Sequence, residues 1–351
     1  MIPDTPENDA RIKRVVERIV ERTSRGESHP KRELPLNKAH FPKLLCLDQN
    51  KWIDLAKAHY GRAGGEPFVD VLATIRDGIA KGRLIVPVMP SNLIEVSEPV
   101  NEGRRQRLAE FMVDLSGNCS MLKPDPVERV QLKHAILRLF EGKDPGPFPR
   151  HRLVAWGVAY ALGKQMDGDF LGQALNEPEI SVLGMVHAMD RQSIEAGRGF
   201  DEQAAAVARK ARAGGLTEDQ WWIAELYNLF LTTGPTADAL KEVVAKVGID
   251  AQAFFTWLAD NLVPFSEEVP DAYVVTRLLL ARDRNADNKT HRNDLKDFIF
   301  LKLALPYGNI VVGENLWVHL ARAEALDRKY DTTIISDLRD LPSKLTEQQC
   351  M

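Results

Sequence analysis

The chain has 351 residues, 44% of them hydrophobic, which is enough to bury the core of one large or two ordinary domains. It carries 46 Lys and Arg against 50 Asp and Glu, so any nucleic-acid-binding surface has to be a local patch. No apolar run approaches the roughly 20 residues that cross a bilayer, and the N-terminus lacks a signal-peptide hydrophobic region. We therefore expect a cytoplasmic protein without a membrane partner.

Residues 1–42 are predicted to form a helical arm followed by a linker. Apolar residues recur at helical spacing from Ile12 to Val20 among Arg and Glu, which indicates an amphipathic helix. Gly and Pro residues among charges then predict an extended connector over residues 23–42.

A buried strand is predicted next. The four consecutive apolar residues Leu44–Leu47 are typical of a strand that is covered on both faces, and Asp48 follows at its carboxyl end. Apolar residues at helical spacing from Trp52 to Ala56 then predict a helix. The turn between strand and helix points the Asp48 carboxylate into the crevice where open α/β sheets bind ligands.

A second apolar run, Leu84–Val88, repeats this plan. It leads into Pro90–Glu95, which predicts a helix with an acid in its first turn, and we expect this helix to extend to Leu115. Residues 119–122 predict a further short strand. Strands and helices therefore alternate over residues 43–125.

From residue 126 to residue 282 the pattern changes to long helical periodicity with Gly and Pro breaks, which predicts a helical insertion. Within it, Thr217–Gln220 before Trp221 has the order of a capped helix start.

The alternation of helices and strands returns over residues 283–351. A helix is predicted to open at Asn293–Asp297, and strands are predicted over residues 309–313 and 332–335. Neither α/β segment has enough strands to be stable alone, so we expect the two segments to meet in one sheet.

Five acids fall at the predicted strand ends and helix starts of these two segments. Because the carboxyl ends of parallel strands lie at one edge of a sheet, we expect the acids to converge on a common crevice. Carboxylates that are forced together repel, and a hard divalent cation, Mg²⁺ or Mn²⁺, is the usual relief. The five candidate catalytic and metal-binding residues are Asp48, Glu95, Asp294, Asp297 and Glu314.

Helix capping is an equally good explanation for any single acid. Asp48 suits an N-cap, and the pairs Asn92/Glu95 and Asp294/Asp297 have the spacing of a capping box. Ser, Thr or Asn would cap as well, however. The use of carboxylates at every such point therefore favours the metal site.

These segments resemble the PIN-domain nucleases. The likeness lies in the strand that ends at Asp48 and Asn50, in the Pro90–Glu95 turn, in the helix start Asn293–Asp297 with Leu305-Pro306-Tyr307, and in Val311–Glu314. It implies a PIN-like three-layer α/β/α domain with a central parallel sheet, formed by residues 43–125 and 283–351 and interrupted by the helical insertion. It also implies that the acids bind Mg²⁺ or Mn²⁺ for hydrolysis of phosphodiester bonds, most often in RNA.

The resemblance assigns roles to individual acids. Asp48 would bridge the metals, Glu95 with Asp294 or Asp297 would complete the site, and Glu314 stands where the family usually has Asp. The implied function is that of a metal-dependent endoribonuclease acting on RNA such as tRNA or mRNA. By analogy alone, the inserted helices and the arm suggest a nuclease restrained by a regulatory protein partner or by homo-oligomerisation, as in toxin and phage-defence systems.

Basic residues near the acids are candidates for holding substrate phosphates. A run of Lys and Arg between positions 282 and 296 surrounds Asp294, and Arg104–Arg107 is placed on the helix that begins near Glu95. A solvated helix face explains the second group equally well. The predicted substrate-binding residues are Asn50, Lys51, Arg284, Lys289 and Arg292.

Two other functions fit the same pattern. A metal-dependent DNA nuclease would use the same ligands, and substrate competition would distinguish it from a ribonuclease. A catalytically silent interaction protein would use the α/β part as a scaffold and the Trp-containing helices as its binding module. Saturable heat on titration with Mn²⁺ would distinguish a metal site from a set of helix caps.

Overall fold

A computed structural model describes residues 5–25, 42–98, 101–146, 153–161, 177–187, 215, 217–284 and 294–348. Helices dominate it, and a four-stranded parallel sheet in the order β2-β1-β5-β6 forms the centre of the α/β part. Leu44 pairs with Ile85 and Leu45 with Ile310, so the two ends of the sequence share one sheet, as predicted. The strands are β1 (Lys43–Leu47), β2 (Leu84–Ile85), β5 (Ile310–Val312) and β6 (Thr333–Ile335).

Helices cover both faces of this sheet, because successive side chains of β1 point to opposite faces and all are apolar. Leu45 packs in one buried cluster with Trp52, whereas Leu44 packs in a second cluster with Trp317. The first face is covered by α2 (Gln49–His59), α3 (Val69–Ala80), α5 (Glu102–Ser116) and α19 (Leu341–Glu347). The second face is covered by α15 (Pro270–Asp283), α16 (Asp294–Tyr307) and α17 (Asn315–Ala323).

The helix predicted from Pro90 to Leu115 is in fact two helices, α4 (Pro90–Ser97) and α5. Asn101 begins the second one, since its side-chain oxygen accepts a hydrogen bond from the backbone N–H of Arg104 at 2.8 Å. The prediction that Arg104–Arg107 lies on the helix of Glu95 is therefore wrong.

The strand predicted over residues 119–122 is present as β3 (Cys119–Met121), but it lies outside the parallel sheet. It pairs antiparallel with β4 (Val154–Trp156), a strand within the segment that the sequence predicts as helical. In the described ranges, the β-type pairing between β3 and the chain just after β2 is limited to one isolated bridge, between Val88 and Ser120.

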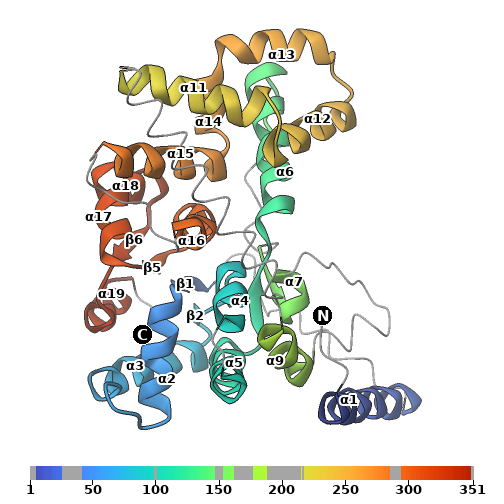
Figure 1. Ribbon diagram of the computed structural model, residues 1–351, viewed down its shortest axis with the longest axis vertical. Helices are drawn as coiled ribbons and strands as arrows, with labels where there is room; N and C mark the ends of the chain where they lie inside the picture. The colour runs from blue at the N-terminus through green and yellow to red at the C-terminus, as the bar shows by residue number, and fades with distance from the viewer. Residues whose placement is uncertain are drawn as a thin grey trace.

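The predicted helical insertion packs in two places. One group of its helices encloses a separate core around Phe230, Phe254 and Phe265, at the end of the molecule farthest from α2 and α3 (Figure 1). In contrast, α9 packs against α4 and α5, and Val182 joins the core beside the sheet. The predicted insertion also includes α15, which covers the second face of the sheet. Its other described helices are α6 (Pro124–Ala135, continued as a π-helix over Ile136–Phe140), α7 (Val158–Ala161), α9 (Pro178–Val186), α11 (Glu218–Leu231), α12 (Pro235–Val247), α13 (Ala251–Asp260) and α14 (Leu262–Glu267).

Buried polar contacts fasten the distant helices to the α/β part. The side-chain amide of Gln131 on α6 donates hydrogen bonds to Asp271 Oδ1 on α15 at 2.8 Å and to the Tyr307 hydroxyl on α16 at 2.6 Å. Because buried polar groups are stable only when they are paired, this cluster fixes the relative position of three helices.

The predicted N-terminal amphipathic helix is α1 (Pro6–Ser24). Its apolar face, with Val15 and Ile19, packs on Ile180 of α9, and Arg18 forms an ion pair with Glu179 at 2.8 Å (Figure 1). The predicted linker lies mainly within residues 26–41, outside the described residues. Among the helices that the structure describes, none has the length and apolar character needed to span a membrane.

Candidate functional site

Asp48 and Glu314 occupy corresponding places on neighbouring strands. Asp48 follows β1 at the N-cap of α2, and Glu314 follows β5 at the N-cap of α17. Because β1 and β5 pair in parallel, both acids lie at the same edge of the sheet. The side-chain amide of Asn50 joins the two turns by donating to Glu314 Oε1 at 2.7 Å.

Glu95 and Asp297 reach the same edge from two helices that pack together, α4 and α16. The indole N–H of Trp317 donates to Asp297 Oδ2 at 2.8 Å and fixes this carboxylate. Lys296, on α16, forms an ion pair with Glu98 at 2.9 Å, and its charge also acts on Glu95. The acids thus come from four different elements.

The pKa values of three acids show how strongly this edge disfavours negative charge. Burial, followed by the charge of Asp48, raises the pKa of Glu95 to about 9. Burial and then the charges of Asp48 and Glu314 raise the pKa of Asp297 to about 8. Burial also raises the pKa of Asp48 to about 6, although the backbone amide of Gln49 partly opposes it. These carboxyls are therefore close enough to repel one another.

One carboxylate oxygen of Asp48 has no hydrogen-bond partner among the described residues. Its side chain is buried, with 5% of the residue exposed, and its Oδ2 atom has no hydrogen-bond partner in the part of the chain that the structure describes. A buried carboxylate oxygen without a partner costs free energy, which a proton or a cation would recover. Asp48 is the N-cap residue of α2, but its side chain makes no cap hydrogen bond, so helix capping does not explain why this oxygen is buried.

Asp294 has a different environment from the other four acids. Its Oδ2 atom accepts a hydrogen bond from the guanidinium of Arg282 at 2.9 Å, and both side chains are almost completely buried. Arg282 also pairs with Asp283 at 2.9 Å. The charge of Asp294 contributes to the raised pKa of Asp297, so it lies near the cluster. The end of α15 thus places a buried arginine beside the site.

The side chains of the site are of the type that binds a hard divalent cation, but they are not close enough together to coordinate one. Within the described ranges, no group of three or more His, Cys, Asp or Glu side chains has an arrangement that could hold a metal ion. Carboxylate oxygens are nevertheless the donors that Mg²⁺ and Mn²⁺ prefer, and Asp48 Oδ2 is available for one. Asp48, Glu95, Asp297 and Glu314 are the side chains that would have to move closer together to hold it.

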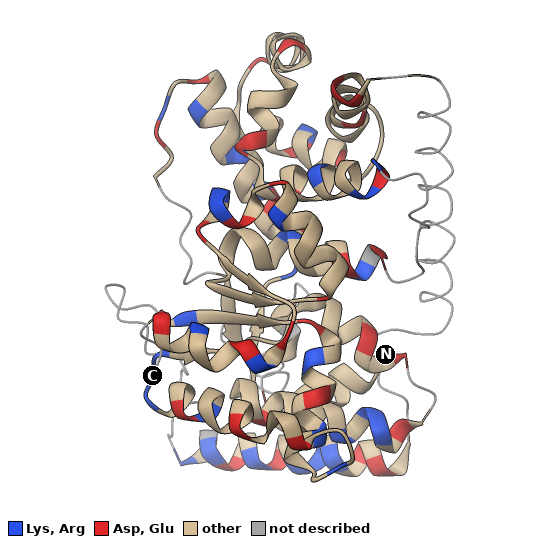
Figure 2. Cartoon of the chain, turned by 90° about the vertical axis from the view of Figure 1, so that its left-hand side faces the viewer, with Lys and Arg blue, Asp and Glu red and all other residues tan. Residues whose placement is uncertain are grey.

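The predicted substrate-binding residues have separate surroundings. Asn50 contacts Glu314, and the Lys51 ammonium donates to the backbone carbonyl of Ser336 at 2.7 Å. The guanidinium of Arg284 is engaged by Glu218 at 2.8 Å and also by Glu324. Lys289 and Arg292 lie outside the described residues. Figure 2 shows Lys and Arg interspersed with Asp and Glu over the described helices.

The sequence did not predict that Trp317 would hold Asp297 or that Arg282 would pair with Asp294. Trp317 stands three residues after Glu314, so the first turn of α17 supplies both, and this spacing was a usable signal. Arg282 belongs to the basic run that the sequence places around Asp294, but its role as a buried partner of this acid, rather than as a phosphate contact, depends on how α15 and α16 pack together.

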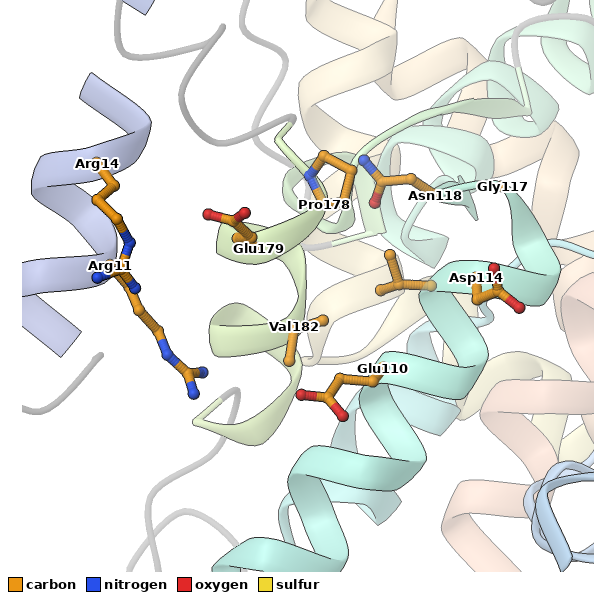
Figure 3. Close-up of a pocket in the computed structure, with 10 residues that line it drawn as sticks. Arg11, Arg14, Glu110, Asp114, Gly117, Asn118, Pro178, Glu179 and Val182 are labelled. Carbon is orange, nitrogen blue, oxygen red and sulfur yellow. The ribbon is translucent and has the colours of Figure 1, made fainter. Parts of the chain in front are cut away.

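A cavity of about 590 Å³ lies elsewhere, between α1, α5 and α9 (Figure 3). Arg11 and Arg14 of α1 line one side of it, and Glu110 and Asp114 of α5 line the other. Its described lining residues include none of the five acids. We therefore place the candidate site at the sheet edge, where buried carboxyls repel one another, rather than in this cavity.

Comparison with models of protein families, with curated proteins and with solved structures gave no match for this chain. The resemblance to PIN-domain nucleases therefore depends on the short motifs around the acids.

The raised pKa values predict that the metal-free protein loses stability as the pH rises. Glu95 and Asp297 keep protons when folded at pH values where the unfolded chain has released them. The folded state then binds more protons, so the free energy of unfolding falls from about pH 4 to about pH 9. Each such carboxyl contributes a slope of at most about 1.4 kcal/mol per pH unit.

Urea unfolding in EDTA at several pH values measures this slope. Glu95→Gln should make it shallower by the contribution of one carboxyl. The control Glu110→Gln, an exposed glutamate on α5, should leave it unchanged. An equally steep slope in Glu95→Gln and in the original protein would contradict the assignment.

Proposed function

We propose that this protein is a metal-dependent nuclease that hydrolyses phosphodiester bonds of RNA. The observation that carries the proposal is the buried Asp48 carboxylate, which has an unpartnered oxygen and lies among acids that raise one another's pKa. Strongly perturbed carboxyls gathered at the ligand-binding edge of a parallel sheet are typical of functional sites. A set of helix caps would not need to be buried together.

Within this proposal the acids have two kinds of role. Asp48, Glu95, Asp297 and Glu314 hold Mg²⁺ or Mn²⁺, and Asp294, paired with Arg282, positions the start of α16. When bound, such a cation supplies Lewis-acid stabilisation of a phosphate and makes a water molecule more acidic. Trp317 holds the Asp297 carboxylate in one orientation, and Asn50 does the same for Glu314.

Further features of the proposal follow from the PIN resemblance rather than from the geometry. They are the PIN-like three-layer architecture, endonucleolytic attack, a cytoplasmic location, and restraint by a protein partner or by self-association in a toxin or phage-defence setting. The helices of the inserted segment would select or restrain the substrate.

Removal of divalent cations is expected to abolish cleavage. A purified sample should cut single-stranded RNA in Mg²⁺ or Mn²⁺, lose activity in excess EDTA, and regain it when Mn²⁺ is added back, because the cation would supply the Lewis acid and the more acidic water that hydrolysis needs. Competition between RNA and DNA of the same sequence distinguishes a ribonuclease from a DNA nuclease.

Titration with Mn²⁺ alone tests the alternative of a silent interaction protein. Saturable heat with release of protons at pH 7 is expected for the metal site, since Glu95 and Asp297 must deprotonate to bind. No heat and no cleavage of either nucleic acid would favour the interaction protein.

A further inference from the structure

A second concave surface adjoins the acids at the same edge of the sheet. Its volume is about 380 Å³, within the range of about 300–1,000 Å³ that is usual for small-ligand sites. It is lined by the first turns of α2 and α17, by the short helix η1 (Glu66–Phe68) and by the chain that follows β6. Since α2 and α17 also carry Asp48 and Glu314 at their N-caps, the pocket lies beside the proposed nuclease site, although none of the five acids is among its described lining residues.

Lys51 lies at the junction between the pocket and the acids. It lines the pocket, and its charge also acts on Asp48 on one side and on Asp337 on the other. One of the three N–H groups of its ammonium is used by the carbonyl of Ser336. Within the described ranges the ammonium makes no other hydrogen bond or ion pair, so it has donors for an anionic ligand.

The far wall of the pocket carries a second cation. Arg339, in the short helix η4 (Leu338–Asp340), is paired with Asp337, and 69% of its side chain is exposed. The other acid of the pocket, Asp54, is paired with Lys57 at 2.8 Å. A guanidinium has five N–H donors in a planar fork, so Arg339 can contact a phosphate while it keeps its carboxylate partner.

Apolar side chains lie between the two cations. Phe68 is half-buried against the core beside the sheet, Pro67 is exposed next to it, and Leu338 is buried beneath Arg339. A flat aromatic side chain next to phosphate-binding cations suits a nucleobase, because every base has a π-face that can stack.

We propose that this pocket binds one nucleotide of the substrate, next to the bond that is cut, with its phosphate at Lys51 and Arg339 and its base against Phe68. This inference rests on the proposed nuclease function, and it names the substrate unit as a nucleoside phosphate.

The pocket is tested by titrating the full chain with AMP, adenosine and inorganic phosphate in EDTA, where no cleavage takes place. AMP should bind with saturation and more tightly than either of its parts. Arg339→Ala and Phe68→Leu should each weaken AMP binding by about 5–30-fold, as expected for one charged contact or one stacking contact. The control Arg129→Ala removes a similar exposed arginine, paired with Glu242 on the helical part, and should bind AMP normally.

The outcomes separate this inference from the nuclease proposal. AMP binding that needs Arg339 and Phe68 supports the pocket even if no cleavage of RNA is found. Absence of saturable AMP binding, equal affinity for AMP and phosphate, or binding unchanged in both variants overturns it, whether or not the protein cuts RNA. If RNA is cut, Arg339→Ala should raise KM and leave kcat within about twofold. The reason is that Arg339 contacts a part of the substrate other than the reacting phosphate.

Discussion

Replacement of Asp48 by Asn is expected to reduce RNA cleavage by at least about 100-fold and to leave the protein folded. The carboxylate is buried beside Glu95 and Asp297. Its Oδ2 atom has no hydrogen-bond partner among the described residues and is the oxygen that the proposed cation would bind. The amide has nearly the same shape but carries no charge, so it is a poorer ligand for a hard cation. Cleavage in Mn²⁺ and calorimetric titration with Mn²⁺ should both show the loss.

The stability of this variant distinguishes loss of a ligand from misfolding. Removal of the Asp48 charge removes its repulsion of the Glu95 and Asp297 carboxylates. At pH 8, the metal-free variant should therefore need at least as much urea to unfold as the original protein. Asp70→Asn is the matched control, since Asp70 is an exposed acid in the first turn of α3. Equal cleavage by Asp48→Asn and Asp70→Asn would refute the site.

Replacement of Arg282 by Met should lower the free energy of unfolding by about 3–5 kcal/mol. Arg282 is the buried partner of both Asp283 and Asp294, and its guanidinium lies 5.7 Å from the centre of the Phe298 ring. Its removal takes the same cation away from two buried carboxylates, which is far more costly than loss of an exposed pair. Urea unfolding at pH 7 measures the change.

Two further variants isolate the cause. Arg129→Met breaks the exposed pair with Glu242 and should cost less than about 1 kcal/mol. The double variant Arg282→Met/Asp294→Asn should recover part of the lost free energy of unfolding, because one of the two carboxylates that were paired with Arg282 is then neutral. If Arg282→Met were no more costly than Arg129→Met, the buried pair would not hold α15 to α16.

The sequence predicted those elements whose signals are local. An apolar run followed by an acid located β1 and Asp48, and the order Thr217–Gln220 located the start of α11, where both bonds of the capping box are present. The meeting of the two distant α/β segments in one sheet followed from the small number of strands in each. These inferences require only periodicity and helix chemistry.

Features that depend on tertiary packing could not be predicted in this way. The three-residue strand β4 forms because β3 is available to pair with it, and nothing in its own sequence distinguishes it from the surrounding helices. The division between α4 and α5, in contrast, had local signals that the prediction did not use: Pro99 and the Asn101 cap interrupt the segment, and no apolar residue falls between Val100 and Leu108. The partner of Asp294 depends on how two helices cross, and the pocket at Arg339 depends on the strand order.

The pairing of β1 with β5 also has a consequence for synthesis of the protein on the ribosome. Leu44 and its hydrogen-bond partner Asn309 are 265 positions apart, so β1 emerges long before the strand beside it. At about 5–20 residues per second, translation of that interval takes roughly 10–50 s. A nascent chain therefore exposes one open edge of β1 and lacks Asp297 and Glu314 throughout this time. A site that needs Asp297 and Glu314 therefore cannot be complete until both α16 and the strand β5 have been made.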